Sequence, residues 1–291
     1  MRQDAPTFDL QSHSRHSDGA LAPRDVVAAA AAAGVELLSL TDHDTVDGVR
    51  EAADAAVEVG IRLVTGVEIS ALDESGRDLH ILGYLIDDRK PELLERLERY
   101  RADRERRSEA MVEALRELGF ELDEGPLERR MAIGKPIGRP HLAEAVTAHP
   151  GNAERLLTEG LAEPSAFLGA YLIKGAPAFR SRQLPSVPEA IAAIHDAGGV
   201  AVWAHPFWDI SAAAQVLDAI DRFRADGIDG VECFYVSHTA EQTTLLAERC
   251  VELGLLSTGS SDFHGPEHPL MSGFRAFRTY GLTPQLGPLR A

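Results

Sequence analysis

The stretch Val-Glu-Leu-Leu-Ser-Leu-Thr-Asp-His-Asp, residues 35–44, joins a short apolar run to side chains that bind metals. The run Val35–Leu40 predicts a buried β-strand, because it is short and lies between two helical patterns. Asp42, His43 and Asp44 follow it directly. We therefore expect a strand that ends in a loop carrying a histidine between two aspartates.

Six further apolar runs predict strands of the same kind, and helical patterns separate most of them. This alternation indicates an α/β fold with a parallel, buried sheet. The expected strands are Phe8–Leu10, Ile61–Val67, Leu79–Leu85, Gly199–Ala204, Gly230–Phe234 and Leu255–Ser257. The expected helices run from Pro23 to Gly34 and over Gly48–Val59, Pro188–Ala197, Ser211–Ala225 and Ala240–Leu253.

The middle of the chain has a different pattern. Leu93–Gly119 is a charged, amphipathic helical stretch, and strand signals are almost absent from residues 88–185. We expect a barrel body formed by residues 1–87 and 186–291. Residues 88–185 would then be a mostly helical insertion between the fourth and fifth strands, a cap that shapes the substrate pocket. The alternative is a separate packing domain with no role in substrate choice.

Composition limits the partners. The net charge of −17 disfavours an extensive nucleic-acid surface or binding to an anionic membrane. Divalent cations bound at a site would reverse this sign locally, so the net charge constrains the wider surface and says little about a pocket. The two cysteines match no metal or redox pattern, and neither a signal peptide nor a membrane-spanning run is visible. We expect a cytoplasmic protein.

Polar residues of metal-binding type follow nearly every predicted strand. In a parallel barrel the carboxyl ends of the strands share one face, so these residues would converge there. Each element alone has a simpler explanation: Asp44 suits a helix cap, and His80 suits a satisfied core histidine. Their recurrence favours a multinuclear metal site. The residues are Gln11, His13, Asp18, Asp42, His43, Asp44, Glu68, His80, His205, Asp262 and His264.

The motifs around these residues resemble those of the PHP (polymerase and histidinol phosphatase) family of phosphoesterases. They are Asp-Leu-Gln-Ser-His-Ser-Arg-His-Ser-Asp-Gly, Leu-Thr-Asp-His-Asp, Gly-Val-Glu-Ile-Ser, Leu-His-Ile-Leu-Gly-Tyr, Ala-His-Pro and Gly-Ser-Ser-Asp-Phe-His-Gly. The resemblance covers the chain except its middle insertion, and it implies a distorted (β/α)7 barrel. It is strongest to the branch that acts on nucleoside 3′,5′-bisphosphates or trims short RNA from the 5′ end.

The resemblance also implies three metal positions. The first would lie between residue 11, His13, Glu68 and Asp262. The second would use Glu68, His80 and His205, so that Glu68 bridges the two. The third would use Asp18, His43 and His264. The chain departs from the family at Gln11, where histidine is usual; a neutral amide is a poorer ligand for zinc or iron, which favours manganese or magnesium at the first position.

Further roles complete the expected site. Water activated by the ions is the expected nucleophile, with no dedicated protein base. Asp42 and Asp44 are expected to orient histidines, with helix capping as the alternative. Candidates for substrate binding are Arg139, His141, Lys174 and His238, the last also a candidate acid; the alternative for Arg139 is a surface residue after a turn.

The sequence thus predicts a metal-dependent phosphoric ester hydrolase with two or three divalent ions (Mn, Zn, Fe or Mg, with Mn favoured). The expected substrate is a small phosphorylated molecule, a nucleotide of the nucleoside 3′,5′-bisphosphate type, and 5′→3′ exonuclease activity on short RNA is the expected second activity. One alternative is a histidinol-phosphate phosphatase. The other, suggested by Gln11, is a metal-binding scaffold that has lost catalysis.

Overall fold

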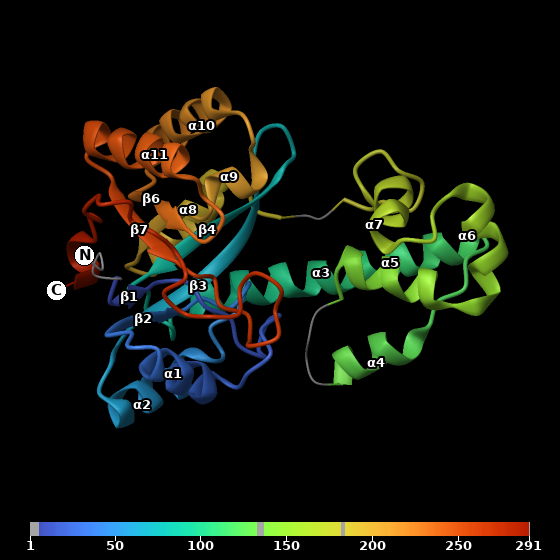
Figure 1. The fold of residues 1–291 in the computed structure, drawn as a ribbon, viewed down its shortest axis with the longest axis horizontal. Coiled ribbons are helices and arrows are strands. Elements are labelled where there is room, and N and C mark those ends of the chain that lie inside the picture. The colour runs from blue at the N-terminus through green and yellow to red at the C-terminus, as the bar shows by residue number, and fades with distance from the viewer. Residues whose placement is uncertain (1–5, 133–136, 182–183, 291) are drawn as a thin grey trace. The chain divides into compact units, whose positions relative to one another are not determined.

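The computed structural model describes residues 6–132, 137–181 and 184–290 (Figure 1). The chain forms two compact units. The first contains residues 1–98 and 184–291, and the second contains residues 99–183.

A single seven-stranded sheet forms the centre of the first unit, and its strands follow one another in chain order. Every expected strand is present, with bounds shifted by a few residues. The strands are β1 (Phe8–Asp9), β2 (Leu37–Leu40), β3 (Arg62–Leu72), β4 (Asp78–Tyr84), β5 (Val200–Trp203), β6 (Gly230–Tyr235) and β7 (Leu256–Ser260).

The expectation of a wholly parallel sheet is wrong at β4, which runs antiparallel to both β3 and β5. The reason is the connection before it. Residues 73–77 form a tight turn in which the Asp73 side chain accepts from the Arg77 amide at 2.8 Å. So short a link permits a hairpin but no crossover to a parallel strand. The other neighbouring pairs, β1–β2, β2–β3, β5–β6 and β6–β7, are parallel.

The first and last strands nearly close the sheet into a barrel. The Leu10 amide donates to the Gly259 carbonyl at 3.2 Å, and the loops beyond these strands continue the contact through a parallel bridge between Ser12 and Phe263. The terminal strands therefore support each other, and the fold is the expected distorted (β/α)7 barrel.

Helices cover the outside of the barrel (Figure 1). Capping boxes begin two of them, Ser186 with Glu189 before α8 and Thr239 with Gln242 before α11. Gly254 ends α11 in a left-handed conformation with φ of 66°. The helices are α1 (Pro23–Ala32), α2 (Val49–Val59), α8 (Val187–Asp196), α9 (Pro206–Asp209), α10 (Ala213–Ala225) and α11 (Ala240–Leu253), with the 3-10 helix η3 (Gly287–Arg290) near the C-terminus.

Helices and the loops between them make up the second unit, and its described residues contain no strand. Its core contains an aromatic cluster in which Phe120 packs edge-on against Phe167 and Tyr171, with ring centroids 5.0 and 4.9 Å apart. The elements of this part of the chain are α3 (Pro91–Glu117), which begins in the first unit, α4 (Glu124–Ala132), α5 (Arg139–Ala148), η1 (Pro150–Asn152), α6 (Ala153–Glu159), α7 (Pro164–Phe167) and the π-helical turn η2 (Leu168–Leu172).

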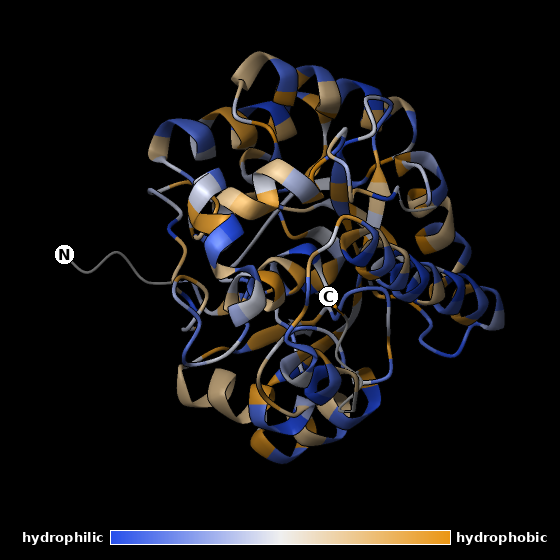
Figure 2. Cartoon of the chain, turned by 90° about the vertical axis from the view of Figure 1, so that its right-hand side faces the viewer, coloured by the Kyte–Doolittle hydropathy of each residue, from blue (hydrophilic) through white to orange (hydrophobic). Residues whose placement is uncertain are grey.

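Hydrophilic and hydrophobic residues alternate along the helices (Figure 2). This pattern fits helices that bury one face against a core and expose the other to water. Among the described residues, none of the helices combines the length and the apolar character that a membrane span requires.

Tyr84 ties β4 to the loop after β1 through the barrel interior. Its side chain is fully buried, and its hydroxyl donates to the Leu10 carbonyl at 2.9 Å. We expect Tyr84→Phe to lower the free energy of unfolding by about 1–2 kcal/mol, because a buried carbonyl loses this donor. Urea unfolding followed by circular dichroism measures the change. Val57→Ala, at a side chain that is 82% exposed, is the control, and an unchanged midpoint for Tyr84→Phe would contradict the prediction.

Candidate metal centre

The predicted ligands come from loops and strands at one rim of the barrel. His13 and Asp18 lie in the loop after β1, and His43 lies in the loop after β2. Glu68 lies within β3. The remaining ligands are His80 near the start of β4, His205 directly before α9, and Asp262 and His264 in the loop after β7.

The direction of β4 explains why His80 reaches this rim. His80 pairs with Ser70 in the hairpin, and its carbonyl accepts from the Ala204 amide at the end of β5, at 3.0 Å. Because β4 is antiparallel, its first residues lie beside the last residues of its neighbours. A ligand at the amino end of β4 therefore joins ligands at the carboxyl ends of the parallel strands.

The Glu68 carboxylate is at the centre of the cluster and has no solvent exposure. Its Oε1 lies 2.7 Å from His80 Nδ1 and 3.3 Å from His205 Nε2. Its Oε2 lies 3.1 Å from His13 Nε2 and 3.5 Å from His43 Nδ1. Each oxygen thus faces two imidazoles, as a carboxylate that bridges two cations would.

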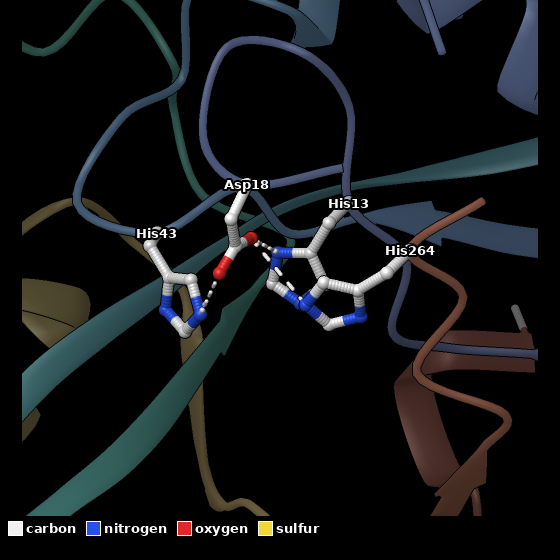
Figure 3. A group of neighbouring side chains, drawn as sticks. All are labelled: His13, Asp18, His43 and His264. Atoms are coloured by element: carbon white, nitrogen blue, oxygen red, sulfur yellow. Dashed lines mark ion pairs between the residues drawn. The ribbon is translucent and has the colours of Figure 1, made fainter. Parts of the chain in front are cut away.

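Asp18 occupies a similar position in a second group, which Figure 3 shows together with His13, His43 and His264. Asp18 Oδ1 lies 3.3 Å from His264 Nε2 and 3.6 Å from His13 Nδ1, and Oδ2 lies 3.6 Å from His43 Nε2. The four side chains come from three separate loops and point toward one another.

A third group joins His13, Glu68 and Asp262. Asp262 Oδ1 lies 3.0 Å from His13 Nε2 and 3.6 Å from His264 Nδ1. The ligand atoms lie within 4.8 Å of one another in each of three groups: His13 with Asp18, His43 and His264; His43 with Glu68 and His80; and His13 with Glu68 and Asp262. His205 belongs to none of these three, although its Nε2 lies 3.3 Å from Glu68 Oε1. His13 belongs to two groups through its two ring nitrogens, so the groups are adjacent.

The donor atoms fit divalent cations. His13 Nε2, His43 Nδ1, His205 Nδ1 and Asp262 Oδ1 are buried and have no hydrogen-bond partner. A buried polar atom without a partner costs free energy, so it needs an explanation. His13 Nε2 lies close to two carboxylate oxygens without being aligned to donate to them. Imidazole nitrogens and carboxylate oxygens that converge in this way are the ligands that zinc, manganese and iron take in proteins.

The histidines of the cluster stabilise the ionised form of its carboxylates. Burial tends to raise the pKa of the Asp262 carboxyl, but His13 and His264 outweigh it and hold this pKa at about 2. Surrounding histidines likewise keep the pKa of Glu68 well below its usual value despite burial. Burial lowers the pKa of His43 to about 4, so its imidazole is neutral at pH 7, the form that binds a metal.

The backbone is strained at three positions of the centre. His205 has φ of 29°, Asp44 of 53° and Asp262 of 51°, in the region that residues other than glycine rarely occupy. Glu232 Oε2 accepts from the His205 amide at 3.0 Å, and Asp44 accepts from the Ser70 amide at 2.9 Å. Such strain persists only where surrounding contacts fix the chain, and it clusters at functional sites.

Comparison with known proteins identifies the family of this chain. The family model for the PHP domain matches residues 9–122. The 5′-3′ exoribonuclease of Haemophilus influenzae is 36% identical over 260 residues, which cover 89% of this chain and 90% of that protein. The chain belongs to the PHP domain family.

Two further matches extend along the chain. The 3′,5′-nucleoside bisphosphate phosphatase of Chromobacterium violaceum is 34% identical over 260 residues, 89% of this chain and 87% of that protein. A solved structure of a metal-dependent phosphoesterase from Bifidobacterium adolescentis is 31% identical, with a TM-score of 0.72 and coverage of 90% of this chain and 89% of that one. These matches confirm the PHP family, the barrel fold and the enzyme class, a phosphoric ester hydrolase, that the sequence predicts.

Gln11, the departure from the usual PHP motif, is fully buried beside Glu68. Its amide nitrogen donates to Glu68 Oε2 at 3.0 Å, and its oxygen accepts from Ser260 Oγ at 3.3 Å. Gln11 therefore contacts a predicted ligand through its nitrogen, which cannot bind a metal. This geometry favours the role of a hydrogen-bond partner.

Asp42 and Asp44 are both buried, and each fixes a neighbouring segment. Asp42 accepts from the amide and hydroxyl of Ser14 at 2.7 and 2.6 Å, and from Ser17 Oγ at 2.6 Å. Ser17 Oγ lies 3.4 Å from His13 Nδ1, so Asp42 reaches a histidine through one hydroxyl. Capping of the next helix is not their role, because α2 begins after Gly48 without a side-chain cap.

Three side chains that the sequence did not single out contact the centre. The Tyr235 hydroxyl donates to Asp262 Oδ2 at 2.8 Å, Asp209 Oδ2 lies 3.6 Å from His205 Nδ1, and Glu232 accepts from the His205 amide. The contact between Asp209 and His205 could have been predicted from their spacing of four residues. The contacts of Tyr235 and Glu232 could not, because both residues lie in an apolar strand and the residues they meet are known only from the fold.

His238 is buried, and its ring packs against Phe207 and Tyr235. Its Nδ1 lies 3.1 Å from the Cys233 carbonyl, which can only accept a hydrogen bond, so this nitrogen carries the proton. Burial lowers the pKa of His238 to about 4. A neutral ring with its proton at Nδ1 has only an acceptor at Nε2, which disfavours the expected roles of acid and phosphate contact.

Arg139, His141 and Lys174 lie in the second unit. Arg139 is the first residue of α5, and His141 Nδ1 accepts from the Gly138 amide at 2.9 Å, which caps that helix. Lys174 follows η2. Their expected role in substrate binding stays a prediction.

Loss of Glu68 removes the carboxylate that the largest number of imidazoles share. We expect Glu68→Ala to release at least one ion per chain, because metal affinity depends on the number and charge of the ligands. Elemental analysis after gel filtration measures the ions bound. Glu248→Ala, at an exposed position of α11, is the matched control. Metal content equal to that of the wild type in Glu68→Ala would place the centre elsewhere.

Proposed function

We propose that the chain binds two or three divalent cations around Glu68 and hydrolyses a phosphate monoester of a small nucleotide, of the nucleoside 3′,5′-bisphosphate type. Trimming of short RNA from its 5′ end is the proposed second activity. One observation carries the proposal: a buried carboxylate contacts four imidazoles, and several atoms of the cluster lack any hydrogen-bond partner.

The side chains have distinct roles in this proposal. Divalent cations supply the positive charge that attracts phosphate and that lowers the pKa of water toward neutrality. Glu68 holds the groups together from the interior of the barrel. Tyr235 binds Asp262 Oδ2 and leaves Oδ1 to face His13. Asp209 places a carboxylate oxygen 3.6 Å from His205 Nδ1, so its negative charge favours a proton or a cation at that nitrogen.

The proposed substrate class rests on two considerations. The relatives named above are a nucleoside bisphosphate phosphatase and an exoribonuclease, and both act on phosphate esters of nucleotides. The net charge of −17 opposes extended contact with a long nucleic acid, so a short substrate is favoured. Arg139, His141 and Lys174 of the second unit are the proposed phosphate contacts, and cytoplasmic location is part of the proposal.

The proposed identity of the ions rests on the ligand types around Gln11. Manganese is the proposed metal, because a site with fewer imidazoles and more oxygen ligands discriminates less strongly in favour of zinc. With Gln11 donating to Glu68, occupancy of the first position depends on His13, Glu68 and Asp262 alone.

Replacing Gln11 by histidine tests its role. If residue 11 is a ligand position, Gln11→His adds an imidazole, and we expect more ions to remain bound per chain after gel filtration. Elemental analysis measures this number, and Gln215→His, at an exposed residue of α10, controls for an added histidine. An unchanged number would show that residue 11 acts only as a partner of Glu68.

Activity measurements separate the proposed function from its alternatives. We expect chelation to abolish hydrolysis and manganese to restore it, with adenosine 3′,5′-bisphosphate hydrolysed faster than histidinol phosphate. Phosphate release, measured colorimetrically, reports both rates. Faster turnover of histidinol phosphate would favour the first alternative. Full metal content without hydrolysis of any phosphate ester would favour a scaffold that has lost catalysis.

A further inference from the structure

An exposed tryptophan lies next to the metal centre. Trp208 belongs to the short helix α9, which begins directly after His205, and its amide donates to the His205 carbonyl at 2.8 Å. The side chain of Trp208 is 53% exposed. The other tryptophan, Trp203, is fully buried in the barrel. Trp203 is therefore part of the hydrophobic core, whereas the indole of Trp208 is accessible to solvent.

Aromatic contacts connect Trp208 to the predicted ligands. Its ring packs edge-on against Tyr235, with centroids 6.2 Å apart. The Tyr235 ring in turn lies 5.2 Å from the His205 ring, and the Tyr235 hydroxyl binds Asp262. One aromatic ring thus separates the exposed indole from a predicted metal ligand. Tyr235 is buried and hydrogen-bonded, so the edge of the indole packs against a ring whose own position is fixed.

Large apolar side chains are rarely exposed in the stretch of chain around Trp208. Between residues 184 and 250, all of which the structure describes, Trp208 is the only large apolar side chain with high exposure. A protein partner needs a wider apolar patch than one ring. A single flat ring beside a phosphate-binding centre suits a planar group that is covalently joined to the phosphate.

We infer that Trp208 is a specificity-determining residue, whose indole stacks on the base of the nucleotide whose phosphate is bound at the metal centre. This inference rests on the proposed function. It adds the side chain that would distinguish a nucleotide from other phosphate esters by contacting the base. The ribose would span the region beside Tyr235 and place the base on the indole. Every base has an aromatic face, so the contact selects nucleotides without selecting a sequence.

Binding of two phosphates that differ only in the base tests the inference. The probes are adenosine 5′-monophosphate and ribose 5-phosphate, each added to the metal-loaded full chain. We expect Trp208→Ala to weaken binding of the first by roughly tenfold and to leave the second unchanged, since stacking on an aromatic side chain contributes to the affinity for the base alone. Trp208→Phe keeps an aromatic face and should retain most of the affinity. Isothermal titration calorimetry measures the affinity of the wild type, Trp208→Ala and Trp208→Phe for each phosphate.

Intrinsic fluorescence gives a second readout. The chain contains two tryptophans, and Trp203 is inaccessible, so quenching by the nucleotide reports on Trp208. We expect quenching by adenosine 5′-monophosphate and none by ribose 5-phosphate. Val251→Ala, which shortens another exposed apolar side chain, should behave as the wild type.

Two results would overturn the inference. One is equal loss of affinity for both phosphates in Trp208→Ala, and the other is unchanged affinity for adenosine 5′-monophosphate. Both are binding results. Failure of the proposed function would instead appear as absence of hydrolysis of any ester by the wild-type enzyme, so the two failures are distinguishable.

Discussion

A carboxylate without access to water, surrounded by four imidazoles, is the constraint on which the rest of the structure depends. Burying the Glu68 charge in the barrel is costly unless opposite charge is close by. Histidines from four different segments supply partners for its two oxygens. Protons on these rings can balance the charge, and a cation does so more completely. The same burial that makes the carboxylate unfavourable alone makes the cluster a strong site for metal ions.

The barrel brings segments that are distant in the sequence to this carboxylate, and its one antiparallel strand contributes one of them. Six strands deliver side chains from their carboxyl ends or from within. β4 delivers His80 from its amino end, next to the end of β5. Around the centre, Ser17, Tyr235 and Asp209 contact the predicted ligands, so the geometry is fixed by a second layer of polar groups.

Much of this arrangement was predictable, because a short apolar run followed by histidine or aspartate indicates a buried strand with a candidate metal ligand at its end. The strands and the convergence of the ligands follow from that pattern. The direction of β4 was mistaken, although the brief link between residues 72 and 78 held the necessary information. Tyr235 and Glu232 were not predictable, since their contacts join β6 to segments far away in the sequence. The same is true of Gln11, whose hydrogen bond to Glu68 depends on the curvature of the sheet, which brings the loop after β1 to a strand that is not its neighbour.

Closure of the barrel between its first and last strands makes most of the centre dependent on one seam of the sheet. His13, in the loop after β1, meets Asp262 and His264, in the loop after β7, in two of the three ligand groups. The third group, His43, Glu68 and His80, uses neither of these loops. Fraying of β1 or β7 would therefore dismantle two groups and leave the third assembled.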